Sequence, residues 1–154
     1  MQVGDSDVAG TANLQRQRET TFATLFFAEY DDATRRLRYA NCGHLAGLVI
    51  RGDDRIDRLE PTATVLGLFD DWQCSVAETD LFAGDIVALY TDGVTETVDG
   101  GGEEFGEKRL EAVLKRHHDS SSPPALVDDV IAAVQAFGAA EQFDDITVIV
   151  GMGK

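Results

Sequence analysis

The sequence predicts an α+β domain in which helices cover one face of a β-sheet. Segments before residue 91 alternate polar and apolar side chains or are rich in β-branched and aromatic residues, as strands are. Two segments after residue 106 carry apolar residues at helical spacing, and a final apolar segment follows them. The order of strands, two helices and a returning strand is typical of the α+β class.

The composition fits one globular domain with an acidic surface. The chain has 154 residues, of which 44% are hydrophobic, and its 28 Asp and Glu residues against 13 Lys and Arg give a formal charge of −15. This charge argues against nucleic acid or an anionic membrane surface as a partner. A chain of this length predicts a single hydrophobic core.

Cysteine usage and hydropathy point to the cytoplasm. No apolar run approaches the roughly 18 residues of a membrane span, and the opening MQVGDSDVAG lacks the features of a signal peptide. Cys42 and Cys74 are isolated, and no histidine is spaced from either as in a zinc-ligand set, so we expect reduced thiols and no zinc site. The protein is therefore expected to be cytoplasmic, without membrane insertion.

The strands come first along the chain. Residues 1–20 are expected to be a poorly ordered or helical N-terminal segment, and residues 21–154 the folded domain. Turn residues at 31–34 join the first two strands into a β-hairpin. Strands are expected at residues 21–30, 36–41, 45–50, 56–59, 73–80, 86–90 and 146–150. The strand at 86–90 is predicted to be buried on both faces, and the last strand to be of the central type.

Two helices follow. The first is expected over residues 107–118, with Lys115 in a basic last turn that complements the helix dipole. The second begins with Ser122 as N-cap and Pro123 at the first helical position, and it ends near Gly138.

Acidic residues lie at the ends of the two most apolar predicted strands. Asp92 and Gly93 follow the strand at 86–90, and Asp144 and Asp145 precede the final strand. If these strands are antiparallel neighbours, Asp92 and Asp144 share one rim of the sheet. Their carboxylates would then reach one Mg²⁺ or Mn²⁺ ion, which prefers oxygen ligands and can activate a bound water.

A purely structural interpretation of these residues is also open. Asp-Gly and Asp-Asp are among the commonest turn residues between strands. Gly93 would let the backbone turn sharply in either case. Spacing alone does not choose between a metal site and two turns.

Several segments in this order resemble the stage II sporulation E and RsbU-type bacterial phosphatases, a branch of the metal-dependent protein phosphatase 2C superfamily. They are Phe22–Phe26 (FATLF), Tyr39–His44 (YANCGH), Leu66–Leu68 (LGL), Gly84-Asp85, Leu89–Glu96 (LYTDGVTE) and Phe143–Thr147 (FDDIT). The similarity runs from about Thr20 to Gly151.

The resemblance implies an α/β/β/α sandwich of two antiparallel sheets flanked by helices, incomplete here at the N-terminus. It implies two Mn²⁺ or Mg²⁺ ions at one end, with Asp92 and Asp144 at the positions of metal ligands. It also implies hydrolysis of phosphoserine or phosphothreonine in a signalling partner such as an anti-sigma-factor antagonist. A metal-activated water would attack the phosphorus, so no catalytic side chain is expected.

The N-terminal end departs from the family pattern. The family has a GDxxD strand and a DVSGKG turn whose aspartates bind the metals, and this chain begins too late for both. Only Asp7 lies in a segment similar to the second motif, so it is a candidate ligand, with a disordered acidic N-terminus as the alternative. Gly93 is a further candidate beside Asp92. We expect a truncated or internally deleted domain.

The remaining candidates have supporting roles. Thr95, Glu96 and Asp145 are expected to orient the metal ligands from behind. His44 and Asn41 are expected to be structural, and Cys42 to be a small buried hydrophobic residue. His117 and His118 are expected to be exposed and to interact favourably with the helix dipole. Phe69 and Trp72 are expected to belong either to the edge of the core or to a surface that docks a partner.

Two functions of different classes remain open. The first is a regulatory protein serine/threonine phosphatase. The second is a catalytically incompetent remnant that serves as a binding or dimerisation module, in which a homodimer protects an uncovered sheet. A calcium-binding module fits less well, because the chain lacks the acidic loop spacing of an EF-hand.

Overall fold

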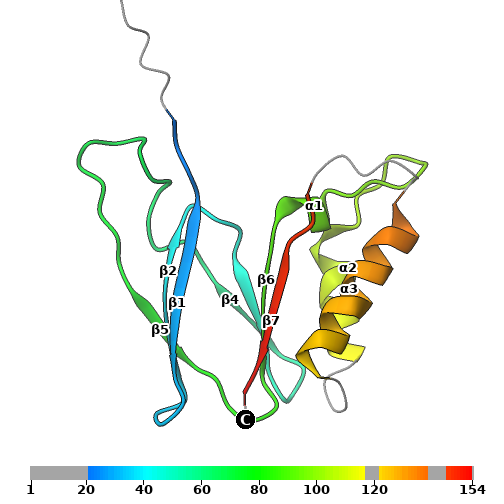
Figure 1. Ribbon diagram of the computed structural model, residues 1–154, viewed down its shortest axis with the longest axis horizontal. Coiled ribbons are helices and arrows are strands. Elements are labelled where there is room, and N and C mark those ends of the chain that lie inside the picture. The colour runs from blue at the N-terminus through cyan, green and yellow to red at the C-terminus, as the bar shows by residue number, and fades with distance from the viewer. Residues whose placement is uncertain (1–20, 117–121, 139–144, 154) are drawn as a thin grey trace, which may run out of the picture.

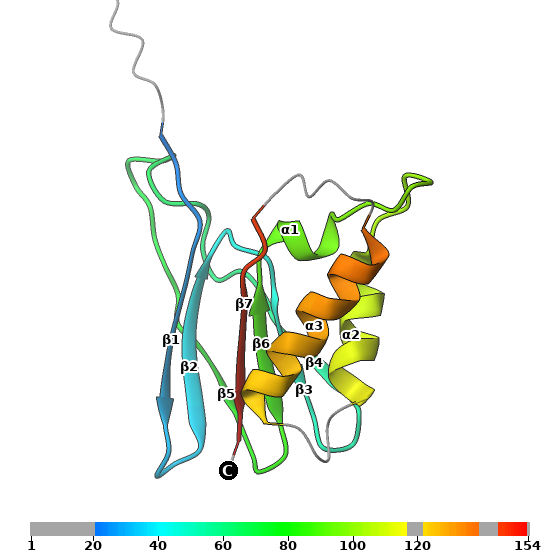
Figure 2. The same cartoon turned by 45° about the vertical axis from the view of Figure 1, so that its right-hand side comes forward.

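The computed structural model describes residues 21–116, 122–138 and 145–153. Two antiparallel sheets pack face to face, and two long helices cover the far side of one of them (Figures 1 and 2). The elements are β1 Leu25–Asp31, β2 Arg36–Cys42, β3 Gly47–Ile50, β4 Ile56–Leu59, β5 Ala77–Asp80, β6 Ile86–Tyr90, α1 Asp92–Thr95, α2 Gly106–Arg116, α3 Pro123–Phe137 and β7 Val148–Met152. The predicted α+β class and paired antiparallel sheets are confirmed.

The first sheet has the order β1-β2-β5. The predicted hairpin is confirmed, with β1 and β2 paired from Leu25↔Cys42 to Asp31↔Arg36. Its turn is fixed by Asp31, whose Oδ1 accepts hydrogen bonds from the backbone N–H groups of Ala33 (2.9 Å) and Thr34 (3.3 Å). A hydrogen bond from the Thr34 side chain, followed by these backbone bonds, lowers the pKa of Asp31.

The strand predicted at residues 73–80 is only half formed. β5 begins at Ala77, and residues 73–76 are outside it. The reason is a competing segment: the N–H groups of Thr62 (2.8 Å) and Ala63 (3.0 Å) both donate to the carbonyl of Asn41. This segment lies against the end of β2, so residues 73–76 cannot pair there.

The second sheet has the order β4-β3-β6-β7. β6 is flanked by β3 and β7, and Ile86, Ala88 and Tyr90 are buried, as predicted for an inner strand. The prediction that the last strand is central is wrong. Within the described residues β7 is an edge strand, and Ile149 is 59% exposed. A run of β-branched residues indicates that a segment tends to form a buried strand, but it does not show which strands lie beside it.

The single predicted core is in fact divided in two by the four-stranded sheet. Leu48 and Ile50 of β3 face the helices, while Val49 between them faces the three-stranded sheet. All three side chains are fully buried. The alternation of a strand sends successive side chains to opposite faces, so one strand contributes to both clusters.

The two predicted helices are confirmed as α2 and α3. They lie side by side on the four-stranded sheet (Figure 2), with Leu110 and Leu114 of α2 and Val130 of α3 buried against it. Ser122 is the N-cap of α3, although its side chain makes no capping hydrogen bond. The short helix α1 replaces a predicted turn, because Glu96 N–H donates to Asp92 O at 2.7 Å.

The three-stranded sheet has a face turned away from the rest of the molecule (Figure 1). In the part of the chain that the structure describes, no helix packs on this face, so the layers present are helix, sheet and sheet. Leu25, Phe27 and Val76 are 45%, 62% and 56% exposed.

Among the helices of the described residues, none has the length and hydropathy of a membrane-spanning segment.

Candidate functional site

The end of β6 and the start of β7 form one rim of the four-stranded sheet, as predicted. Beyond the paired strands, Thr91 N–H donates to Thr147 O (3.1 Å) and Thr147 N–H donates to Thr91 Oγ1 (3.0 Å). The Thr91 hydroxyl in turn donates to the carbonyl of Asp145 at 3.0 Å. These bonds bring Asp92, the next residue after Thr91, to the same rim as Asp145.

Asp92 is held through its backbone. Its carbonyl accepts hydrogen bonds from Glu96 N–H (2.7 Å) and from the Thr95 hydroxyl (3.4 Å). Gly93 N–H donates to Asp92 Oδ1 at 3.0 Å, and the carboxylate is exposed at the surface. Thr95 and Glu96 thus fix the main chain of Asp92, and Gly93 orients its carboxylate.

A pocket of about 220 Å³ opens beside this carboxylate. It is lined by residues just outside the strands of the two sheets: Thr24, Gly43, His44, Leu45, Thr91 and Asp92. His44 and Asp92, which are far apart in the sequence, therefore face one space. Neither motifs nor spacing predict a role at the site for Thr24, Leu45 or Thr91. Two of them nevertheless lie within quoted segments, Thr24 in FATLF and Thr91 in LYTDGVTE.

Asn41 supports the wall that carries His44. Its side chain is fully buried, and its Oδ1 accepts a hydrogen bond from His44 N–H at 2.9 Å. Its Nδ2 donates to the carbonyls of Leu45 and Leu59, both at 3.2 Å. A buried amide with all of these partners holds the turn from residue 42 to residue 45 in one conformation.

Gly43 makes this turn sterically possible. Its φ of +70° lies in the left-handed region, and a Cβ at this position would come within 2.5 Å of Val65 Cγ1. Only glycine avoids both the backbone strain and the clash. The turn is therefore pressed against the segment that contains Val65.

A partly buried polar network lies behind the rim. The Tyr90 hydroxyl donates to Glu107 Oε2 at 3.0 Å, and Arg58 forms an ion pair with Glu107. Burial, followed by the nearby charge of Glu107, raises the pKa of Tyr90, so the phenol stays protonated as a hydrogen-bond donor. This network connects the last residue of β6 to α2.

Some of the oxygen atoms at the rim are suitable ligands for a hard cation. Asp92 offers a carboxylate next to the pocket, and oxygen ligands are those that Mg²⁺ and Mn²⁺ prefer. The Gly93 carbonyl already accepts a bond from the Thr97 hydroxyl at 2.7 Å. Residues 21–116, 122–138 and 145–153 contain no group of three or more His, Cys, Asp or Glu side chains able to hold a metal ion.

Several predicted residues fall elsewhere. Asp7, Asp144, His117 and His118 lie outside the described residues. Cys42 is buried, as predicted. In the loop after β4, the Trp72 indole N–H donates to Thr64 O at 2.8 Å, while Phe69 is exposed.

The chain is similar to known phosphatases. Residues 8–151 match the family described as stage II sporulation protein E. The chain is 29% identical over 130 residues to Protein IcfG of Synechocystis, and 30% identical over 130 residues to phosphoserine phosphatase RsbU of Bacillus subtilis. These alignments cover 83% and 84% of this chain but only 20% of IcfG and 38% of RsbU.

Solved structures share the fold. The SiaA-PP2C domain of Pseudomonas aeruginosa superposes with a TM-score of 0.75 at 22% identity, over 87% of this chain and 53% of that one. The phosphatase domain of SpoIIE from Bacillus subtilis, presoaked with Mn, gives 0.64 at 18% identity, over 85% and 56%. This chain thus spans about half of each domain.

Proposed function

Because this chain belongs to the stage II sporulation protein E family, we propose that it is part of a metal-dependent protein serine/threonine phosphatase domain. The observation that carries the proposal is the position of Asp92, whose carboxylate lies at a sheet rim beside a pocket between the ends of the two sheets. The similarity of the motif LYTDGVTE to that family supports the proposal that Asp92 is a metal ligand.

The proposed cofactor is Mn²⁺ or Mg²⁺. Asp92 would hold it, with Asp144, Asp7 and Gly93 as the further candidate ligands. When bound, such an ion supplies an activated water and neutralises charge on a phosphoryl group. Thr95, Glu96 and Asp145 are proposed to support the ligands.

The residues of the chain position the substrate around that centre. Asn41 fixes the turn that presents His44 to the pocket, and Thr91 ties the Asp92 rim to β7. The proposed substrate is a phosphoserine or phosphothreonine side chain of a cytoplasmic signalling protein, of the anti-sigma-factor antagonist type. Its phosphate would be repelled by the formal charge of −15 without a cation at the rim.

Calorimetric titration with Mn²⁺ and phosphate release from a phosphoserine peptide test the proposal together. Asp92→Asn should abolish the release and weaken Mn²⁺ binding at least tenfold. The matched control is Asp53→Asn in the exposed turn after β3, where Asp53 Oδ1 accepts a bond from Arg55 N–H. If both variants bind Mn²⁺ and release phosphate equally well, the assignment of the metal site to Asp92 is wrong.

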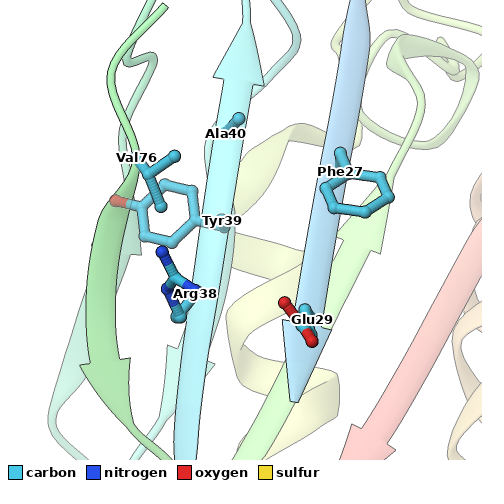
Figure 3. A pocket seen from close by; sticks show the side chains of 6 residues that line it. All are labelled: Phe27, Glu29, Arg38, Tyr39, Ala40 and Val76. Atoms are coloured by element: carbon cyan, nitrogen blue, oxygen red, sulfur yellow. The ribbon is translucent and has the colours of Figure 1, made fainter.

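A second function, a binding module that forms a homodimer, is favoured by the uncovered side of the three-stranded sheet. We call the surface formed by Phe27, Glu29, Arg38, Ala40 and Val76 the outer face; with Tyr39 it lines a hollow of about 230 Å³ (Figure 3). Its apolar end would bury Phe27 against a second copy. Glu29 and Arg38 give it both charges, so a two-fold arrangement can pair one copy's Glu29 with the other's Arg38.

Sedimentation measures this second function directly. The wild type should show a dimer that Phe27→Glu converts to a monomer, whereas Ile149→Glu on β7 should leave the dimer intact. A wild type that remains monomeric at high concentration would remove the second function.

A further inference from the structure

His44 lies half-buried in the wall of the pocket of about 220 Å³ that Asp92 also lines. Of the described residues that line this pocket, only these two have an acidic or basic side chain. Histidine ordinarily gains and loses a proton near neutral pH, so it can pass a proton to a bound molecule. The pocket therefore combines a carboxylate that suits a cation with a side chain that suits proton transfer.

Three contacts restrain the orientation of His44. Its backbone N–H donates to Oδ1 of the buried Asn41 at 2.9 Å. Its ring Nδ1 lies 3.2 Å from Leu45 O. Its ring also meets the ring of Phe26 edge to face, with the centroids 6.5 Å apart and the planes at 80°. An imidazole that is held in this way is positioned for a specific task and not only for packing.

The contact with Leu45 distinguishes the two ring nitrogens. A carbonyl oxygen only accepts hydrogen bonds, so Nδ1 carries a proton and donates it to Leu45 O. In the part of the chain that the structure describes, no residue forms a hydrogen bond with Nε2 of His44. Nε2 is thus the nitrogen that is available to a molecule in the pocket, and it carries a proton whenever the ring is cationic.

We propose that His44 is a catalytic residue that protonates the leaving group of the phosphatase reaction, a role that rests on the proposed function. The bond between phosphorus and the serine Oγ breaks, its electron pair stays on Oγ, and Oγ takes the Nε2 proton. The oxygen of a water molecule forms the new bond to phosphorus, and one proton of this water leaves to solvent. The neutral ring then takes up a proton from solvent, while Nδ1 stays bound to Leu45 O.

The need for this proton depends on the leaving group. A serine alkoxide is strongly basic, so it departs slowly unless a proton donor stabilises it. Nitrophenolate is a stable anion and departs without a proton. A side chain that donates a proton to the leaving oxygen is therefore required for a phosphoserine ester and dispensable for a nitrophenyl ester.

The test compares a phosphoserine peptide with p-nitrophenyl phosphate as substrates of the Mn²⁺-loaded protein. In His44→Asn, the amide offers a donor near the position of Nδ1 but no atom at the position of Nε2. The variant should lower kcat for the peptide by about 100-fold or more, and kcat for the nitrophenyl ester by less than about threefold. Retained hydrolysis of the nitrophenyl ester also shows that the variant is folded.

The matched control is Leu45→Ala. It changes the same pocket wall and keeps the carbonyl that accepts from His44, so it should change both rates by the same factor. Equal losses for the two esters in His44→Asn, or no loss for either, would overturn the role of His44 and leave the proposed phosphatase function standing. A wild type that hydrolyses neither ester would instead contradict the proposed function, and the role of His44 with it.

Nuclear magnetic resonance of the His44 ring gives a readout that needs no turnover. In the ¹⁵N-labelled, Mg²⁺-loaded wild type, inorganic phosphate should shift the Nε2 resonance more than the Nδ1 resonance, and His44→Asn identifies both signals. An unchanged Nε2 resonance, at a phosphate concentration that inhibits the wild type, would show that Nε2 does not contact the phosphate and would overturn the proposal.

Discussion

The guanidinium of Arg51 donates to Asp85 Oδ2 at 2.7 Å, and the two side chains are only 11% and 5% exposed. Arg51 comes directly after β3 and Asp85 directly before β6, so the pair joins the two strands at the end of the sheet away from Asp92. Burial alone would lower the pKa of Arg51, but its bonds to Asp85 and Asp57 raise it. The ion pair is satisfied and structural.

Replacement of Asp85 should destabilise the fold strongly. Asp85→Ala leaves the buried Arg51 without its main partner and removes the acceptor of Gly52 N–H (3.1 Å) and Phe82 N–H (3.0 Å). The expected loss is about 3–5 kcal/mol in the free energy of unfolding, measured by urea denaturation. Glu78→Ala, which breaks exposed pairs, should cost less than about 1 kcal/mol. Similar losses in both variants would contradict this account.

Asn41 should be required for stability as well as for the shape of the pocket. Asn41→Ala removes the acceptor of His44 N–H and leaves two carbonyls without their donor. We expect a loss of about 2–3 kcal/mol in the free energy of unfolding. The control Gln135→Ala, on the exposed side of α3, should change it by less than about 0.5 kcal/mol. A neutral Asn41→Ala would refute the role assigned to this side chain.

Gly43→Ala tests the fit between the turn and the loop. The new Cβ would clash with Val65 in a backbone conformation that disfavours side chains, so the expected cost is about 2 kcal/mol or more, measured by thermal unfolding. A second substitution, Val65→Ala, should relieve the contact with Cγ1 but neither the close approach to Val65 N (3.0 Å) nor the backbone strain. Gly100→Ala, where a Cβ meets nothing within 4 Å, should be close to neutral.

Glu107 should make stability depend on pH in the acidic range. Burial alone would raise its pKa, but the bonds from Arg58 and Tyr90 outweigh burial and lower it from the ordinary value of 4.5. A lowered folded-state pKa stabilises the fold above pH 4.5, and this stabilisation is lost as the pH falls through the folded-state pKa. Urea denaturation at several pH values should give a shallower acid dependence for Glu107→Gln than for the wild type. Parallel curves would rule out this origin.

Local sequence patterns were sufficient to predict most of the strands and the two long helices. The apolar period of residues 107–118 predicts α2, and the turn residues after Tyr30 predict the hairpin of β1 and β2, because both depend on neighbours in the chain. The sequence also predicts that Asp92 and Asp144 share one rim if β6 and β7 are antiparallel neighbours. The pairing of these strands is confirmed, whereas Asp144 lies outside the described residues.

The sequence by itself determined where most of the strands and the two long helices lie, and that Asp92 follows β6 closely. Only the tertiary structure decided that β7 is an edge strand and that residues 62 and 63 displace residues 73–76 from β2. The physical reason is that periodicity records the average burial of a segment, whereas its partner depends on how distant segments compete for the same hydrogen bonds.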